Sequence, residues 1–177
     1  MPIDKNLSEQ LPAVLPPADQ IAIVKIDGVR LRRKVLLGDE RGVILEMMDT
    51  RDPYWDQPLV YAYMGTCRPR KAKGWGYHVS HEDRYAIISG EMILALYDDR
   101  DDSPTKGVVQ EFYLSREGQN QITIPRGIWH AHMNPGDSDL IFVNFPTEHF
   151  AHNDPDKRTL PLDTDKIPYK FKTELGR

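Results

Sequence analysis

The sequence GWGYHVSHEDR at residues 74–84 and the sequence QITIPRGIWHAHMN at residues 121–134 decide the fold of this chain. Each block places histidines beside short runs of β-branched and aromatic residues, with glycine or proline between them. Runs of this kind are typical of β-strands that end in shaped turns. We therefore predict a small β-barrel that presents a polar site in its mouth.

Apolar runs of strand length continue on both sides of these blocks, some alternating with charged residues and some continuous. Strands are expected at residues 21–26, 29–37, 43–48, 59–64, 85–88, 92–97, 108–114, 122–124, 128–133 and 140–145. Asp27 and Gly28 predict a hairpin turn, and residues 38–42 and 98–105 predict polar loops. Nine or ten short strands without a helix between them indicate an antiparallel barrel or jelly roll.

The length of 177 residues fits one domain with a sizeable core. Pro12, Pro16 and Pro17 exclude a regular helix or a central strand near the start, so residues 1–20 are expected to form an extended arm. The jelly roll is expected at residues 21–145. The polar, proline-rich residues 146–177 predict a wrapping tail with room for one helical turn.

Composition excludes several classes of function. The net charge is -4 and 28% of the residues are charged, which does not favour binding to nucleic acid or to an anionic membrane. The single cysteine, Cys67, excludes an internal disulfide and suits a reducing compartment. No apolar segment reaches the ~18 residues of a membrane span, and the first residues lack the apolar core of a signal peptide. We therefore expect a cytoplasmic protein.

Two groups of motifs resemble known families. Residues 125–130, PRGIWH, followed by Asn134, are similar to the second cupin signature, and residues 74–90 are similar to a degraded first one. More narrowly, residues 29–144 resemble the dTDP-4-dehydrorhamnose 3,5-epimerase family. Five motifs in the family's order carry this resemblance: DERG at 39–42 with Glu46, GYH at 76–78, SPT at 103–105 with Gly107, LS at 114–115, and IPRG at 124–127 with His130.

The resemblance implies an all-β double-stranded β-helix, the cupin jelly roll, that forms a homodimer. It also implies a dTDP-linked 4-keto sugar as the partner, without a metal or an organic cofactor. The C4 ketone of such a sugar acidifies the C–H bonds at C3 and C5. The chemistry therefore needs a base of near-neutral pKa and a hydrogen-bond donor to the developing enolate.

The same resemblance assigns residues to this chemistry. It makes His78 the base, with His130 lining the same cavity. The tail carboxylate that orients the base would be Asp163, with Asp165 as the alternative register. Arg41 and Glu46 match positions that contact the nucleotide end of the substrate, across the dimer interface.

Three further residues complete the expected substrate site. Trp75 lies close to His78 and is a candidate for stacking on thymine. Arg84 adjoins the position of a lysine in the family. His132 follows His130 by two residues, so it shares a face with His130 in a regular strand, although a hydrogen-bonded core histidine is an equal alternative.

Several residues depart from the family pattern. The family's tyrosine, which returns a proton to the opposite face of the sugar, corresponds to Phe142, and phenylalanine cannot donate a proton. The family's lysine corresponds to Asp83, its aspartate on the following strand to Leu94, and its arginine to Trp75. We therefore predict an isomerase or tautomerase-like relative rather than a standard 3,5-epimerase. Tyr77, Tyr85 or His132 could replace the missing acid.

A metal site is an alternative interpretation of the histidines. His78, His81 and His130 have the character of a three-histidine cupin site for a divalent metal. Two residues separate His78 from His81, however, and in an alternating strand that spacing turns the second ring to the other face unless a bulge or turn corrects it. We therefore favour a metal-free base over a metal-dependent cupin enzyme. A cupin that binds a sugar nucleotide without catalysis is a further alternative.

Overall fold

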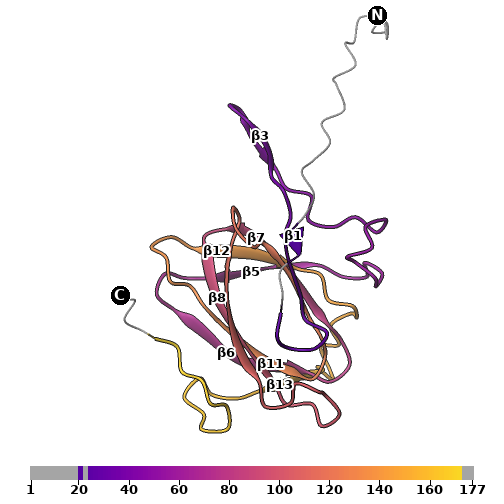
Figure 1. Cartoon of the computed structure of the whole chain (residues 1–177), viewed down its shortest axis with the longest axis vertical. Coiled ribbons are helices and arrows are strands. Elements are labelled where there is room, and N and C mark those ends of the chain that lie inside the picture. The colour runs from indigo at the N-terminus through magenta and orange to yellow at the C-terminus, as the bar shows by residue number, and fades with distance from the viewer. Residues whose placement is uncertain (1–19, 22–23, 173–177) are drawn as a thin grey trace, which may run out of the picture.

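The computed structural model describes residues 20–21 and 24–172, in which every regular element is a β-strand (Figure 1). Six strands form one antiparallel sheet in the order β1 (Gln20–Ile21), β2 (Arg30–Arg33), β10 (Gln121–Ile124), β7 (Asp83–Ser89), β12 (Leu140–Asn144) and β5 (Tyr63–Cys67). Five form a second sheet in the order β13 (Lys157–Thr159), β6 (Ala72–His78), β11 (Ile128–Met133), β8 (Glu91–Asp98) and β9 (Val109–Ser115). The predicted jelly roll is confirmed.

An apolar core fills part of the space between these sheets. Leu94, Leu96 and Leu114 of the five-stranded sheet belong to the same buried cluster as Ile122 and Leu140 of the six-stranded sheet. Full burial of one such side chain contributes about 1.5–3 kcal/mol to the free energy of unfolding. This cluster holds the two sheets together and leaves the remaining space between them for a cavity.

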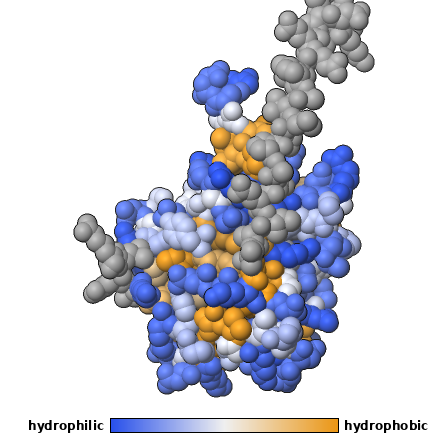
Figure 2. Space-filling model, in the orientation of Figure 1, coloured by the Kyte–Doolittle hydropathy of each residue, from blue (hydrophilic) through white to orange (hydrophobic). Residues whose placement is uncertain are grey.

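A separate hairpin projects away from the barrel in Figure 1. Its strands are β3 (Leu37–Asp39) and β4 (Gly42–Ile44), which pair only with each other among the described residues. Val43 and Ile44 are exposed, and the space-filling view shows a hydrophilic tip above an apolar stem (Figure 2).

The hairpin corrects the prediction of a polar loop at residues 38–42. Asp39 pairs with Gly42 across the turn, and the Asp39 carboxylate accepts a hydrogen bond from the Arg41 backbone N–H at 2.9 Å. Polar residues and glycine therefore mark a hairpin turn here, because an aspartate side chain can hydrogen-bond the backbone two residues on.

Other strand boundaries also differ from the prediction. The turn at Asp27 and Gly28 is present, but residues 24–26 are not a strand. The strand expected at 43–48 ends at Ile44, and the one expected at 59–64 begins at Tyr63 and continues to Cys67. The predicted arm lies outside the described residues, apart from Gln20 in β1.

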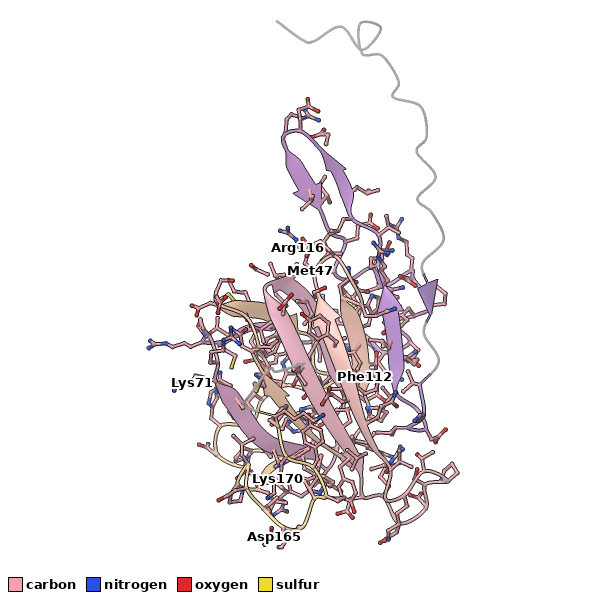
Figure 3. The ribbon with its side chains drawn as sticks, turned by 60° about the vertical axis from the view of Figure 1, so that its left-hand side comes forward. Met47, Lys71, Phe112, Arg116, Asp165 and Lys170 are labelled. Carbon is pink, nitrogen blue, oxygen red and sulfur yellow. The ribbon has the colours of Figure 1, made fainter. Side chains whose placement is uncertain are left out.

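The tail forms a strand instead of the helical turn that we considered. β13 pairs antiparallel with β6, with Lys157 opposite His78 and Thr159 opposite Gly76. The chain beyond this strand packs Ile167 against Trp75 and Ala131 of the five-stranded sheet. Figure 3 shows Asp165 and Lys170 far from the β3–β4 hairpin and Met47 near its base. The tail is therefore part of the sheet that carries His78.

Candidate functional site

An open cavity of about 500 Å³ lies between the two sheets. This volume falls within the range of about 300–1,000 Å³ that is usual for small-molecule sites. Its lining comes from both sheets and from the tail, and comprises Tyr61, Tyr63, Gly65, Lys73, Gly74, Gly76, His78, His81, Asp83, Tyr85, His130, His132, Phe142, Pro146, Glu148, Phe150, His152 and Lys157. The cavity is thus rich in imidazoles and in tyrosine hydroxyls.

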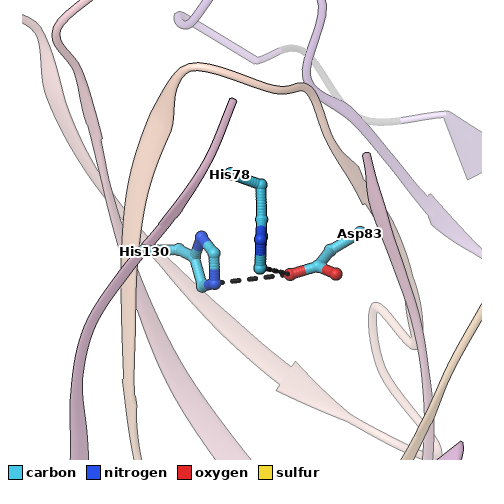
Figure 4. Close-up of side chains that lie close together, drawn as sticks. All are labelled: His78, Asp83 and His130. Atoms are coloured by element: carbon cyan, nitrogen blue, oxygen red, sulfur yellow. Dashed lines mark ion pairs between the residues drawn. The ribbon is translucent and has the colours of Figure 1, made fainter. Parts of the chain in front are cut away.

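Three ionisable side chains converge in this cavity (Figure 4). The Nε2 atom of His78 lies 3.4 Å from Oδ2 of Asp83, and the Nε2 atom of His130 lies 3.3 Å from the same oxygen. His78 ends β6 and His130 lies on the neighbouring β11, whereas Asp83 begins β7 in the other sheet. The cluster therefore bridges the two sheets.

A hydrogen bond from the tail orients the imidazole of His78. Its Nδ1 atom lies 2.9 Å from the carbonyl oxygen of Asp156. A carbonyl oxygen can only accept, so Nδ1 of His78 carries the hydrogen and donates it. In the neutral ring Nε2 is then the basic nitrogen. This nitrogen is the one that faces Asp83.

Asp83 is buried and its charge is compensated. Its Oδ1 atom accepts a hydrogen bond of 2.6 Å from the Asn144 amide, and its Oδ2 atom accepts one of 3.2 Å from the Tyr85 hydroxyl. Burial raises the pKa of Asp83, but the hydrogen bond with His78 and the electrostatic interactions with His130 and His78 outweigh burial, so its pKa lies well below the ordinary value. Asp83 is therefore ionised at neutral pH.

The two histidines of this cluster titrate differently. Burial lowers the pKa of His78, but the hydrogen bond and charge of Asp83 outweigh burial and raise it above the ordinary 6.5. The pKa of His130 falls to about 4, mainly because of burial. At neutral pH His130 is therefore neutral, whereas the raised pKa of His78 favours the protonated form of this ring more than in a free imidazole.

A second group surrounds His81 in the loop after β6. The Nδ1 atom of His81 lies 3.1 Å from Oδ2 of Asp156. The backbone N–H groups of Val79 and Ser80 also donate to this carboxylate, each at 2.9 Å. Burial and the charge of His78 lower the pKa of His81. Asp156 thus holds the loop through its carboxylate, and it holds the His78 ring through its carbonyl oxygen.

Metal ligands in this site would differ from the predicted three histidines. Within the described part of the chain, two sets place three possible ligand atoms within 4.8 Å of one another: His78 with Asp83 and His130, and His78 with His81 and Asp156. Both sets include a carboxylate. The combination of His78, His81 and His130 is not one of them.

The structure brings only some of the predicted site residues to the cavity. His78, His130 and His132 all line it, and so does His81. The Nε2 atom of His132 is buried without a hydrogen-bond partner among the described residues, and burial lowers the pKa of this ring to about 3. His132 is therefore neutral at neutral pH, and its buried Nε2 atom has no hydrogen-bond partner among the described residues.

Trp75 and Arg84 are corrections to the prediction, because both are fully buried away from the cavity lining. The ring of Trp75 packs edge-on against Tyr169, so it cannot stack on a nucleotide base. The guanidinium of Arg84 donates to the carbonyl oxygens of Phe145 at 2.6 Å and Gln57 at 2.8 Å. It ties a loop to the sheet and is not available to a substrate.

The remaining predicted residues lie elsewhere. Arg41 is at the exposed tip of the β3–β4 hairpin, where it pairs with Asp39. Glu46 follows that hairpin, and its Oε2 atom lies 3.6 Å from Nζ of Lys34.

Asp163 does not line the cavity, and its main-chain oxygen accepts a hydrogen bond from Lys170. The predicted pairing of Asp163 with His78 is therefore corrected, because Asp83 and the Asp156 carbonyl occupy the two sides of that ring.

The sequence analysis missed three residues near His78: Asp83 as its carboxylate partner, Asp156 as the residue whose carbonyl holds its ring, and Tyr63 in the cavity wall. For Asp83 a signal was available, because Asp83 and Tyr85 are two residues apart in a strand and so share a face. No local pattern identifies Asp156, since its position depends on how the tail pairs with β6.

The fold and the site together define a cupin-type protein, a jelly roll whose two sheets enclose imidazole and carboxylate groups. The family model described as the polysaccharide biosynthesis C-terminal domain matches residues 37–158. The chain belongs to this family, because the match covers more than half of its length.

Two curated relatives match nearly their full length. The probable low-salt glycan biosynthesis epimerase Agl13 of Haloferax volcanii is 31% identical over 152 residues, which cover 85% of this chain and 97% of the relative. The spore coat polysaccharide biosynthesis protein SpsL of Bacillus subtilis is 29% identical over 154 residues, which cover 85% of this chain and 99% of the relative.

Solved structures agree with the fold. A dTDP sugar isomerase from Desulfovibrio desulfuricans has a TM-score of 0.78 and 25% identity, over 84% of this chain and 94% of that one. A dTDP-4-dehydrorhamnose 3,5-epimerase from Bacillus anthracis has a TM-score of 0.75 at 16% identity, over 86% and 89% of the two chains. No helix within residues 20–21 and 24–172 could span a membrane.

Proposed function

We propose that this protein is a nucleotide-sugar isomerase or epimerase that removes a proton next to the ketone of a dTDP-linked 4-keto-6-deoxyhexose. The observation that carries the proposal is the His78 ring, whose Nδ1 donates to the Asp156 carbonyl and whose Nε2 faces an open cavity beside ionised Asp83. An imidazole held in one orientation beside a carboxylate suits this proton transfer. The relatives in glycan and dTDP-sugar chemistry support the same substrate class.

The proton transfer uses groups in the cavity. Nε2 of His78 takes a proton from C3 or C5 of the sugar, and the C–H electron pair moves into the ketone to give an enolate. Asp83 stabilises the imidazolium that forms. We assign to His132 the stabilisation of the developing negative charge on O4, because its neutral ring lines the cavity and can donate a hydrogen bond.

The fate of the proton distinguishes two outcomes. Return of a proton to the same face of the same carbon regenerates the substrate and is seen only as solvent exchange, whereas inversion requires a donor on the opposite face. Phe142 supplies no such donor. An added Cβ at Gly65 would lie only 2.4 Å from Cζ of Phe142, so the ring packs closely over the backbone of β5. Phe142 is therefore an apolar part of the wall.

Solvent exchange tests the proposed function. We expect the protein, incubated with the dTDP-linked 4-keto sugar in deuterated water, to introduce deuterium at C3 or C5, as located by NMR and mass spectrometry. The same rate is expected after treatment with a chelator, because the proposed base needs no metal. Absence of deuterium at both carbons, at high protein concentration, would contradict proton abstraction. Exchange that stops on chelation and returns with a divalent metal would favour the metal-dependent alternative.

A homodimer is part of this proposal. Arg41 and Glu46 lie on or just after the projecting hairpin and outside the cavity, so we assign them to the nucleotide bound by a second copy. The exposed Val43 and Ile44 on the same hairpin support an apolar contact there. We expect sedimentation equilibrium to give twice the chain mass of 20.4 kDa, and a monomer would contradict this assignment.

We further place the protein in the cytoplasm, where its single thiol would stay reduced.

A further inference from the structure

We propose that Tyr63 donates the second proton in this site, to the face of the sugar that points away from His78. The inference rests on the proposed function and extends it from proton abstraction to inversion of configuration. It assigns to β5 the hydroxyl that Phe142 on β12 lacks.

The position of Tyr63 is the first support. Tyr63 lies on β5, the edge strand of the six-stranded sheet, and lines the cavity. His78 and His130 lie on the five-stranded sheet, which forms the other wall. A sugar bound between the sheets would therefore have the imidazole base on one side and the Tyr63 hydroxyl on the other.

The pairing of β5 with β12 is the second support. Phe142 is opposite Gly65, and Asn144 is opposite Tyr63. Tyr63 and Gly65 are two residues apart and share a face of the strand. Tyr63 on β5 and Phe142 on the neighbouring β12 therefore lie on the same face of the six-stranded sheet, and both line the cavity.

Asn144 determines which atom of Tyr63 is free to react. The Oδ1 atom of Asn144 accepts the backbone N–H of Arg84 at 2.8 Å, which fixes the orientation of the amide. Its Nδ2 group then donates to the Tyr63 hydroxyl oxygen at 2.9 Å and to Asp83 at 2.6 Å. Because the Tyr63 oxygen accepts that hydrogen bond, its own hydrogen remains available, and it has no acceptor among the described residues.

The other tyrosines that the sequence suggested are less suited to this role. The hydroxyl of Tyr85 donates to Asp83 at 3.2 Å, so its hydrogen is already engaged. Tyr77 does not line the cavity, and its ring packs against Trp129 at a centroid distance of 4.9 Å. Burial, together with the charge of Asp83, raises the pKa of Tyr63 to about 12, so this hydroxyl is protonated at neutral pH.

The step is balanced in protons and electrons. The enolate electron pair forms a new C–H bond with the Tyr63 proton while the C4 ketone is restored. The O–H bond of Tyr63 breaks and leaves a phenolate, which the Asn144 amide stabilises by the hydrogen bond it already donates. Tyr63 is 42% exposed, so water can return a proton to it, and the His78 imidazolium releases its proton to solvent.

The test compares Tyr63→Phe with Tyr113→Phe, a matched change at an exposed tyrosine on β9 that does not line the cavity. Deuterium exchange next to the ketone and formation of the inverted sugar are measured separately by NMR. We expect Tyr63→Phe to slow inversion by roughly a hundredfold while exchange on the His78 side continues. Tyr113→Phe is expected to behave like the wild type in both measurements.

Three outcomes would overturn the role of Tyr63. The Tyr63→Phe variant could invert the sugar at the wild-type rate, or it could lose deuterium exchange and inversion to the same extent. The wild type could also exchange deuterium without inverting either carbon. Each of these leaves the proposed proton abstraction intact. Absence of exchange in the wild type would instead overturn the proposed function itself. Phenylalanine keeps the shape of the ring, and a thermal melt of the variant verifies that it is folded.

Discussion

Replacing His78 with asparagine is expected to slow deuterium incorporation into the 4-keto sugar by roughly a thousandfold. Asparagine retains a donor that can reach toward the Asp156 carbonyl but has no basic nitrogen to face the cavity. The affinity for dTDP, measured by calorimetry, is expected to stay close to that of the wild type, because the change removes the base and not the nucleotide contacts. A variant that exchanges deuterium at the wild-type rate would show that the base lies elsewhere.

The pH dependence of the wild type gives a second measure of the same residue. Only the neutral imidazole can accept the proton, and Asp83 holds the pKa of His78 above 6.5. The exchange rate is therefore expected to rise with pH through a pKa above 6.5 and to fall as His78 is protonated below it. His149→Asn is the matched control, because His149 is exposed and does not line the cavity.

Replacing Arg84 with methionine is expected to lower the free energy of unfolding by about 3–5 kcal/mol. The buried guanidinium donates to the carbonyl oxygens of Phe145, Gln57 and Pro58 at 2.6, 2.8 and 2.9 Å. Methionine has a similar length but no donor, so these oxygens lose their partners inside the protein. Urea denaturation measures the change.

Arg51→Met is the control for the buried arginine. The guanidinium of Arg51 is 88% exposed and pairs with Asp49 at 2.7 Å. Exposed pairs of this kind contribute about 0–1 kcal/mol, so the control is expected to unfold close to the wild type. If Arg84→Met lowered the free energy of unfolding as little as Arg51→Met, the assignment of Arg84 to structural support would be wrong.

The fold could be predicted from the sequence because strand signals are local. The alternation of apolar residues and the positions of glycine and proline identified strands around both histidine blocks. The β3–β4 hairpin was missed because the residues of a tight turn, Asp39 to Gly42, have the same polar composition as a loop. Boundaries such as the start of β5 at Tyr63 depend on cross-strand pairing, which no single segment encodes.

The candidate site was only partly predictable. The motifs placed His78 and His130 together, and strand alternation could also have excluded Trp75. Gly74, Gly76 and His78 line the cavity, so Trp75 belongs to the opposite face of β6. The register of the tail could not be predicted, because hydrogen bonds between β13 and β6 determine that Asp156, and not Asp163, reaches the imidazole.

The order of these contacts along the chain has a consequence for biosynthesis. The carbonyl that holds His78 comes from Asp156, 78 residues later in the sequence, and the strand that positions it follows immediately. A nascent polypeptide still lacking that last portion could close most of the barrel but would leave Nδ1 of His78 without its carbonyl partner. Competence for turnover would therefore arise late, after the ribosome has released enough of the C-terminal segment for β13 to join its sheet.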